Sequence, residues 1–393
     1  MHRILHRSSA AVAALTAVLA LAAPAGAQSD ILLRLRSGSP LGDRLRVDSA
    51  GGMVALGQIG YGIIPATGAG WRMMWYPFKV AFRAGYADAG GQFDDAKIGF
   101  YSWAGGALSA APGNYAFAMG NQNLAEAQCS VAIGSGNNVY GNAGDGFATC
   151  GVGLGLNNTV KDQAGVAIGQ NAWSDGDAAV ALGYRATADA DYSMAFGYRA
   201  STNGHTGAKV FGDASTTDSI EAVANNEFAV RAAGGIRMRS NATLTNGCNI
   251  AAGGTTWVCS SSRLLKNHFA EVDLEDVLRR ISQVPLNTWN VIDEVSQARH
   301  MGPFAEDFHA AFGLGDDERA IGLQDMDGVN FAGIKALEAR TTTQAGQIRA
   351  LQAENAELRQ RLETETSELR ARNRTLEERL QRLEALVEPP RKP

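Results

Sequence analysis

The sequence predicts a mainly β protein: a β-roll of 14-residue repeats, followed by a mixed α/β domain and a C-terminal α-helical coiled coil. Three observations predict this order. A short motif ending in glycine recurs between residues 114 and 200, and a leucine-rich heptad pattern closes the chain. Charged residues are sparse from Gln28 to Ser260 and dense from Arg263 onward. This asymmetry of charge indicates two regions that fold in different ways.

The first 27 residues have the pattern of a secretory signal peptide. Met1–Arg7 is basic, Ala10–Ala23 is apolar, and Ala25–Ala27 supplies small residues at the spacing that a signal peptidase cuts. We therefore expect a mature chain that starts near Gln28 and is secreted or held at the cell surface. An uncleaved anchor is the alternative, although the apolar run is short for a bilayer. No later segment of the sequence is apolar enough to span a membrane.

Length, charge and ligand spacing exclude several classes of function. A chain of 393 residues is long enough for two or three folded units. The formal net charge is -5, and no basic run with interleaved aromatic residues occurs, so a nucleic-acid partner is not expected. Beyond the N-terminal segment there is no Cys-x-x-Cys or His-x-x-x-His spacing for a metal. We predict no cofactor and no metal.

Six segments share one pattern in which small and large apolar residues alternate and a glycine comes last. Alternation of this kind is typical of a β-strand with two unlike faces. The terminal glycines are separated by 14, 21, 14, 14 and 14 residues, which indicates stacked coils that cannot bury their apolar faces alone. We expect the large residues to fill the core and the small ones to admit a neighbouring backbone. The segments are Ala116–Gly120, Ser130–Gly134, Gly151–Gly155, Gly165–Gly169, Ala179–Gly183 and Ser193–Gly197.

These repeats resemble the head repeats of trimeric autotransporter adhesins, and Cys129–Ser135 is the segment most similar to them. The resemblance implies a trimeric, left-handed β-roll over residues 114–212, in an elongated surface structure whose partner is the chain itself. A calcium-binding β-roll is the competing interpretation, but its nine-residue Gly-Gly-x-Gly-x-Asp repeat is missing.

Two further β-rich regions flank the roll, residues 28–113 before it and a connector over residues 213–260. Short apolar stretches broken by glycine fill the first region. Its clustered aromatic residues form either a tip that contacts a cell-surface or glycan target, or simply core. The aromatic residues are Trp71, Trp75, Tyr76, Phe78 and Phe82.

Four cysteines in an exported chain predict two local disulfides. Cys129 and Cys150 each lie five residues before a repeat glycine, so they have the same phase and can meet across stacked coils. Cys248 and Cys259 lie symmetrically about Gly253-Gly254, the turn of an expected β-hairpin. A two-residue turn would make them a hydrogen-bonded pair with a Cα spacing of about 5.5 Å.

A serine lies five residues before a lysine at the boundary between the two halves, in Ser261–Lys266. A serine hydroxyl becomes an effective nucleophile when a nearby base takes its proton, and a lysine does this when burial lowers its pKa. Ser261–Asn267 and the blocks after it resemble the C-terminal intramolecular chaperone domain of endosialidases and phage tail spikes, in its bacterial branch. The resemblance extends over roughly residues 255–340, with the domain itself at 261–340. The later blocks are Val284–Asn290, Arg299–Phe308, Phe312–Gly315, Asp325–Val329 and Ala332–Leu337.

This second resemblance implies that the domain trimerises, aligns three copies of the preceding β-structure and then cuts itself off. Carried to this chain, the cut falls between Ser260 and Ser261. Ser261 is then the nucleophile and Lys266 its base, while His300 matches the histidine block and orients or assists them. The activity is that of a single-turnover Ser/Lys autoprotease with no external substrate.

The motif departs from the family pattern at two positions. Ser262 and Glu306 stand where relatives often have Asp and Gln. Ser260 or Ser262 is an alternative nucleophile, but only Ser261 keeps the five-residue separation from Lys266. In the opposing interpretation Ser261 and Ser262 merely cap a helix and Lys266 lies in solvent.

The last segment, residues 341–390, has the leucine periodicity of a coiled coil. Two seams, each with an asparagine that sets register, are joined across a four-residue stutter at Glu363–Thr366. Pro389-Pro390 ends the helix. A lone amphipathic helix that folds onto the chaperone is the alternative. The seams consist of Ile348, Leu351, Asn355, Leu358 and Leu362, then Leu369, Asn373, Leu376, Leu380, Leu383 and Val387.

Three hypotheses of function follow. The leading one is an exported homotrimeric fibre or adhesin whose C-terminal chaperone cleaves itself off. The second is a structural fibre that does not cleave and retains its chaperone and coiled coil. The third is a tail-spike protein that binds or degrades glycans, although residues 28–260 show no assignable carboxylate pair.

Overall fold

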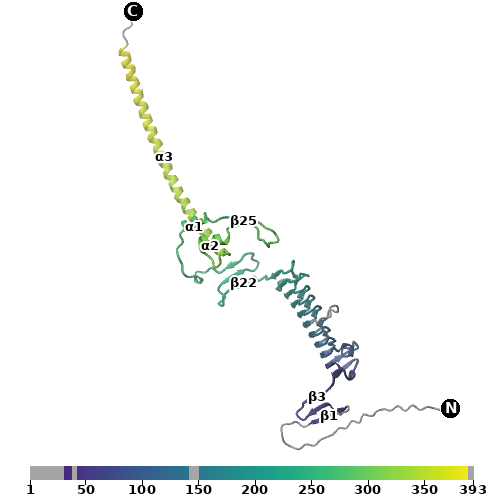
Figure 1. Cartoon of the computed structure of the whole chain (residues 1–393). Coiled ribbons are helices and arrows are strands. Elements are labelled where there is room, and N and C mark those ends of the chain that lie inside the picture. Colours follow the sequence, from purple (N-terminus) through teal and green to yellow (C-terminus); the bar gives the residue numbers. More distant parts are fainter. Residues whose placement is uncertain (1–30, 38–41, 141–149, 388–393) are drawn as a thin grey trace, which may run out of the picture. The chain divides into compact units, whose positions relative to one another are not determined.

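The computed structural model describes residues 31–37, 42–140 and 150–387 of the chain (Figure 1). The predicted fold class is confirmed, because the protein is mainly β with a small α/β region and a long C-terminal helix. The chain divides between Ser260 and Ser261 into two compact units. The expected signal peptide, residues 1–27, lies outside the described residues. Within the described ranges, no helix is both long and apolar enough to cross a membrane.

The first unit begins with a small antiparallel sheet of β1 (Ile31–Ser37), β2 (Gly42–Asp48) and β3 (Met53–Ala55). Next comes the antiparallel pair β4 (Gly70–Tyr76) and β5 (Ala81–Ala87), joined through a short 3-10 turn. A second 3-10 turn, Asp95–Lys97, precedes β6. Strand β5 is also the first strand of a long parallel ladder, so the N-terminal region merges directly into the roll.

Two parallel ladders form the roll, and each repeat adds one strand to both of them. In the 11-stranded sheet the motif strands pair in register, with Ala118 beside Ala132 and Gly153 beside Ala167. The ladder runs from β6 (Trp103–Ala107) through β7 (Phe117–Asn121), β9 (Val131–Ser135), β11 (Val152–Leu156), β13 (Val166–Gln170), β15 (Val180–Tyr184), β17 (Met194–Tyr198) and β19 (Lys209–Gly212) to β21 (Phe228–Arg231). The seven-stranded sheet contains β8 (Leu124–Ala125), β10 (Asn138–Val139), β12 (Thr159–Val160), β14 (Trp173–Ser174), β16 (Thr187–Ala188), β18 (Ala200–Ser201) and β20 (Ile220–Glu221).

The interior of the roll is filled by the small residues of the motif. Ala118, Ala132 and Ala167 are completely buried, whereas Met119 and Ile133 are 41 % and 36 % exposed. The expectation that the large residues fill the core is therefore wrong for the single chain. The motif strands supply only alanine or glycine to the space between the two ladders, and the larger buried side chains Val139 and Val160 come from the seven-stranded sheet. The large residues of the alternating pattern point outward.

The repeat glycines are required by backbone packing. Gly120 has a φ of +119°, and a Cβ there would lie 2.1 Å from the carbonyl oxygen of Gly134 in the next coil. Gly134 meets Gly155 in the same way, also at 2.1 Å. Any larger residue would force adjacent coils apart, which explains why the motif ends in glycine.

A ladder of buried asparagines runs along the inside of the roll. The Nδ2 of Asn137 donates to the Oδ1 of Asn123 at 2.9 Å, and the Nδ2 of Asn158 donates to the Oδ1 of Asn137 at 2.8 Å. All three side chains are almost completely buried. Each Nδ2 also lies within hydrogen-bonding distance of backbone carbonyls of its own coil and the next one, as Asn137 does with Ile133 and Gly155. The amides thus tie consecutive coils together where side-chain volume is scarce.

A second buried polar group lies where the roll begins. The Arg83 side chain on β5 is completely buried and donates to the Ser102 hydroxyl and to the carbonyl oxygens of Ser102 and Ala111. Burial lowers the pKa of Arg83 to about 10. These bonds give a further donor to two carbonyls of the first coil that already accept from the backbone N–H groups of Phe82 and Gly99.

The connector after the roll is a three-stranded antiparallel sheet of β22 (Ile236–Arg239), β23 (Gly247–Ile250) and β24 (Val258–Cys259). Its last strand ends one residue before the boundary between the two units.

The second unit contains a 3-10 turn, Arg263–Leu265, then helix α1 (Leu274–Ile281), the hairpin β25 (Asn287–Trp289) and β26 (His300–Gly302), and helix α2 (Ala305–Phe312). Helix α1 begins at an Asp273 cap, whose side chain accepts from the backbone N–H groups of Glu275 and Asp276. Such a cap satisfies donors that the first turn of a helix leaves unpaired.

Helix α3 (Leu323–Val387) is a single 65-residue helix that contains both the last block of the chaperone resemblance and the expected coiled coil. It starts well before residue 341, and its first turns pack against α1, where Gly333 faces Ile281. The Leu and Ile residues of both seams are more than half exposed in the single chain. The expected end at Pro389-Pro390 lies outside the described residues.

We predict that Asn137→Ala destabilises the roll by about 1–3 kcal/mol, because the buried N–H of Asn158 loses its acceptor on Asn137. The neighbouring variant Asn138→Ala is the matched control, since that side chain lies on the other face of β10. Thermal unfolding of both variants measures the difference. Equal melting temperatures would contradict a stabilising ladder.

Candidate functional site

A single 3-10 turn brings the candidate nucleophile and base together. The Oγ of Ser262 accepts from the backbone N–H of Leu264 at 3.3 Å, and the N–H of Lys266 closes the turn on the carbonyl of Arg263. In this arrangement the Nζ of Lys266 donates to the Oγ of Ser261 at 2.7 Å. The distance is within reach for proton transfer between a nucleophile and its base.

The two opposing interpretations of this segment describe the same geometry. Ser262 does cap a short helical turn, as the purely structural interpretation requires. In this turn Lys266 also points back to Ser261 and donates to its hydroxyl. Both residues are exposed in the single chain.

His300 lies in a separate cluster of the same unit. Its Nε2 is 2.8 Å from the Oε2 of Glu294, and its ring stacks on Trp289 with centroids 4.9 Å apart. Hydrogen bonds from the Ser296 hydroxyl and from His300 hold the pKa of Glu294 below its usual range. Among the described residues, no hydrogen bond joins His300 to Ser261 or Lys266. The assisting role of His300 stays a prediction, and the contacts show that it braces the β25–β26 hairpin.

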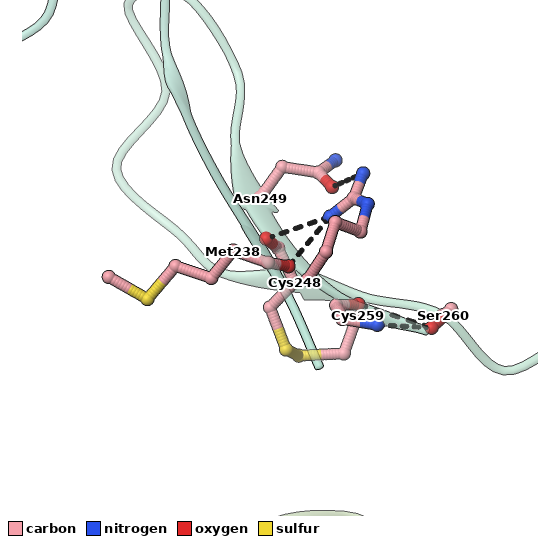
Figure 2. The surroundings of a disulfide bond; sticks show 7 residues. Met238, Cys248, Asn249, Cys259 and Ser260 are labelled. Carbon is pink, nitrogen blue, oxygen red and sulfur yellow. Dashed lines mark hydrogen bonds between the residues drawn. A yellow bond between two sulfur atoms is a disulfide. The ribbon is translucent and has the colours of Figure 1, made fainter. Parts of the chain in front are cut away.

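On the other side of the expected cut, Ser260 is held against β23. Its N–H donates to the carbonyl of Gly247 at 2.9 Å, and its Oγ accepts from the N–H of Gly247 at 3.0 Å (Figure 2). Cys248 and Cys259, the adjacent pair, are joined by a disulfide with a Cα separation of 3.9 Å.

The expected hydrogen-bonded geometry of this cysteine pair is wrong. The ladder hydrogen bonds fall on the flanking pair, Gly247 and Ser260, so the cysteines occupy the closer, non-hydrogen-bonded position. The reason is the connection between the strands, which has a turn at Ala251–Gly254 and further residues before β24, in place of a two-residue turn.

Cys129 and Cys150 are free thiols in this structure, so the second expected disulfide is not formed in it. The two side chains are nevertheless adjacent, since the Cys150 thiol is hydrogen-bonded to Cys129. This contact, together with burial, raises the pKa of the Cys150 thiol. Their common phase in the repeats does bring them together, and the bond itself stays a prediction. Among the described residues, no group of three or more His, Cys, Asp or Glu side chains is placed to hold a metal.

The aromatic residues before the roll differ in burial, and the target-binding tip stays a prediction. Tyr76 is buried and donates a hydrogen bond to Asp95. Its burial, and to a lesser degree this hydrogen bond, raises the pKa of Tyr76 to about 12. Trp71, in contrast, is 79 % exposed on β4. Phe82 and Trp103 stack on the outer face of the 11-stranded sheet, in line with the large residues of the repeats.

Two family models match the chain, one within the β-roll and one in the second unit. The model described as YadA head domain repeat matches residues 111–137, 163–186 and 174–200. The model described as chaperone of endosialidase matches residues 261–313. The chain carries YadA-type head repeats ahead of an endosialidase-type chaperone domain. Neither a curated protein nor a solved structure matches the chain.

The chaperone match sharpens the site in two ways. It begins at Ser261, the residue whose hydroxyl contacts Lys266. It ends at Gly313, so the blocks at 325–337, which form the start of α3, lie beyond it. Both matched families indicate that the chain associates with copies of itself.

We predict that the chaperone hairpin loosens at acid pH. The pKa of Glu294 is lowered in the folded chain, so its contribution is complete above the ordinary glutamate pKa of about 4.3 and is lost as pH falls through the folded value. The protection of residues 287–302 against hydrogen exchange, taken relative to the intrinsic exchange rate at each pH, should therefore fall on acidification of a Ser261→Ala chain. In the additional variant Glu294→Gln this protection should be low at every pH. A pH response that Glu294→Gln leaves intact would contradict this assignment.

Proposed function

We propose that this protein is an exported homotrimeric fibre or adhesin whose C-terminal chaperone aligns three chains and then cuts itself off between Ser260 and Ser261. The observation that supports the cut most directly is the 2.7 Å contact between the Lys266 amine and the Ser261 hydroxyl. It lies at the first residue of the chaperone match and at the boundary between the two compact units.

In the proposed reaction, the Oγ of Ser261 attacks the carbonyl carbon of Ser260 while Lys266 accepts the hydroxyl proton. The C–N bond of the Ser260–Ser261 peptide breaks, the amine of Ser261 takes a proton, and the acyl group passes to the Ser261 oxygen as an ester. Water then hydrolyses this ester. The products are a passenger that ends in the Ser260 carboxylate and a chaperone that starts with the Ser261 amine.

Assembly gates this reaction. A lysine amine in water is protonated at neutral pH and cannot accept a proton, whereas desolvation favours the neutral amine. The dyad is exposed in the single chain, and Leu264 between its members is 95 % exposed. A neighbouring chain that covers Leu264 would desolvate the dyad only after the chains have come together.

The roll itself presents a face that needs covering. In successive strands of the 11-stranded sheet, the large motif residues form two outward columns, one of which contains Met119, Ile133 and Ile168, each at least 36 % exposed. The outer side of the seven-stranded sheet is more polar, with Asn138 and Thr159 in the same kind of position. We therefore place the contacts between chains on the 11-stranded sheets, and on the exposed leucine seam of α3.

Alignment before release fits the symmetry of the repeats. Coils of nearly identical sequence can pair out of register, and a trimer formed first by the chaperone and α3 limits these errors. After the cut, a passenger that unfolds has no chaperone domain to bring its chains together again. Unfolding would therefore be irreversible, and the cut marks the end of assembly.

A fibre that keeps its chaperone is the second candidate. It is favoured by Ser262, which stands where relatives often have Asp and which here caps the turn. In that case the same trimer forms and the chain stays whole.

We predict that wild-type mature chain yields two fragments, 28–260 and 261–393, and that Ser261→Ala and Lys266→Met abolish them. Intact-mass spectrometry after folding measures this. Ser367→Ala, an exposed serine on α3, is the control and should be cut like the wild type. A wild-type chain that remains whole would show that the protein is a non-cleaving fibre.

We further predict that Ile133→Asp, which places a charge on the outer face of the long sheet, dissociates the released passenger into single chains. An unpaired charge in an apolar interface is costly to bury. Thr159→Asp, on the outer face of the seven-stranded sheet, should leave the passenger trimeric. Sedimentation velocity distinguishes the two, and an Ile133→Asp passenger that stays trimeric would place the interface elsewhere.

A further inference from the structure

The residues directly before the expected cut form a covalent clamp. We propose that the Cys248–Cys259 disulfide is a redox-dependent positioning element that holds Ser260, the acyl side of the scissile bond, so that the cut proceeds at its full rate only in the oxidised chain. This inference rests on the proposed self-cleavage.

Strand β24 has little besides the disulfide to hold it in place. It consists of Val258 and Cys259, and every residue from Ala251 to Ser260 is exposed. Two strand pairs without a buried apolar face are marginal in water. The sulfur–sulfur bond to Cys248 is therefore the main restraint on the end of the passenger.

The clamp acts on the next residue, Ser260. Its N–H and Oγ both bond to the backbone of Gly247, which directly precedes the clamped Cys248 (Figure 2). These bonds extend the ladder by one pair, and they persist only while Cys259 stays beside Cys248. The carbonyl that Ser261 must attack belongs to this same Ser260.

Rate depends steeply on such placement. A displacement of about 1 Å between reacting groups can cost on the order of 100-fold in rate. Without the disulfide, Ser260 gains freedom on the acyl side, while the contact between Lys266 and Ser261 on the other side is unchanged because it lies within the 3-10 turn. The loss is therefore one of orientation and not of chemistry.

The redox dependence links the cut to export. Cys248 and Cys259 lose two protons and two electrons to an oxidised thiol–disulfide couple, and one S–S bond forms. Such couples prevail outside the cytosol, where disulfides persist. Cys259 is exposed, so exchange can reach it. A chain still in a reducing compartment lacks the clamp and keeps its chaperone.

Refolding of the mature chain with glutathione disulfide or with a phosphine reductant tests this, with intact mass followed over time. We expect the wild type to be cut about tenfold or more slowly under reduction. A Cys248→Ser/Cys259→Ser chain should be slow in both buffers, whereas a Cys129→Ser/Cys150→Ser chain should behave as the wild type does. Addition of glutathione disulfide to folded, reduced wild type should restore the rate.

Two readouts separate positioning from general damage. The pH of half-maximal cleavage and the sedimentation coefficient should be the same with and without the disulfide, because Ser261, Lys266 and the trimer contacts are untouched. In a Ser261→Ala chain, hydrogen exchange of residues 247–260 should be slower when oxidised.

The possible failures are distinct. Equal cleavage rates in both buffers would overturn the positioning role and leave self-cleavage standing. A wild type that is never cut would overturn self-cleavage, and the positioning role with it. If hydrogen exchange of residues 247–260 is the same in the oxidised and the reduced chain, the disulfide does not restrain this segment.

Discussion

The close, in-register stacking of coils is the constraint on which the rest of the molecule depends. Each coil lies so near the next that a Cβ on Gly120 would approach the Gly134 carbonyl to 2.1 Å. The motif strands turn alanine or glycine inward, and residues such as Ile133 face outward. A roll whose large apolar side chains lie outside is incomplete as a single chain. We propose that association of several chains completes it.

The C-terminal unit also contains two elements whose functional surfaces are exposed in the single chain. Helix α3 exposes its leucine seams over many turns, and the Ser261–Lys266 dyad lies in solvent beside an exposed Leu264. In the proposed mechanism, covering these surfaces aligns the chains and desolvates the dyad in one event. Cleavage would then follow only after assembly. The proposed role of the Cys248–Cys259 disulfide adds a second condition, because it holds the carbonyl side of the bond.

Much of this could be predicted from the sequence, and the failures have physical causes. The spacing of the glycines predicted in-register coils, but alternation alone does not say which face is inside, so Ala132 and Ile133 were assigned the wrong way round. The ladder that contains Asn137 was not predicted, although asparagine recurs three residues after the motif glycine in three successive repeats. The pairing of Cys248 with Cys259 followed from symmetry about two glycines, whereas its hydrogen-bonding phase depends on loop conformation. The turn that joins Ser261 to Lys266 depends on the Ser262 cap, which spacing does not reveal.

The central claim, that assembly precedes and permits the cut, is tested most directly by the dependence of cleavage on chain concentration. Refolding at a series of dilutions, with oligomeric state and intact mass measured on the same samples, would give the order of events. The account predicts that trimers appear before fragments and that the initial cleavage rate per chain falls steeply on dilution. Fragments that arise from single chains at a rate independent of concentration would contradict it.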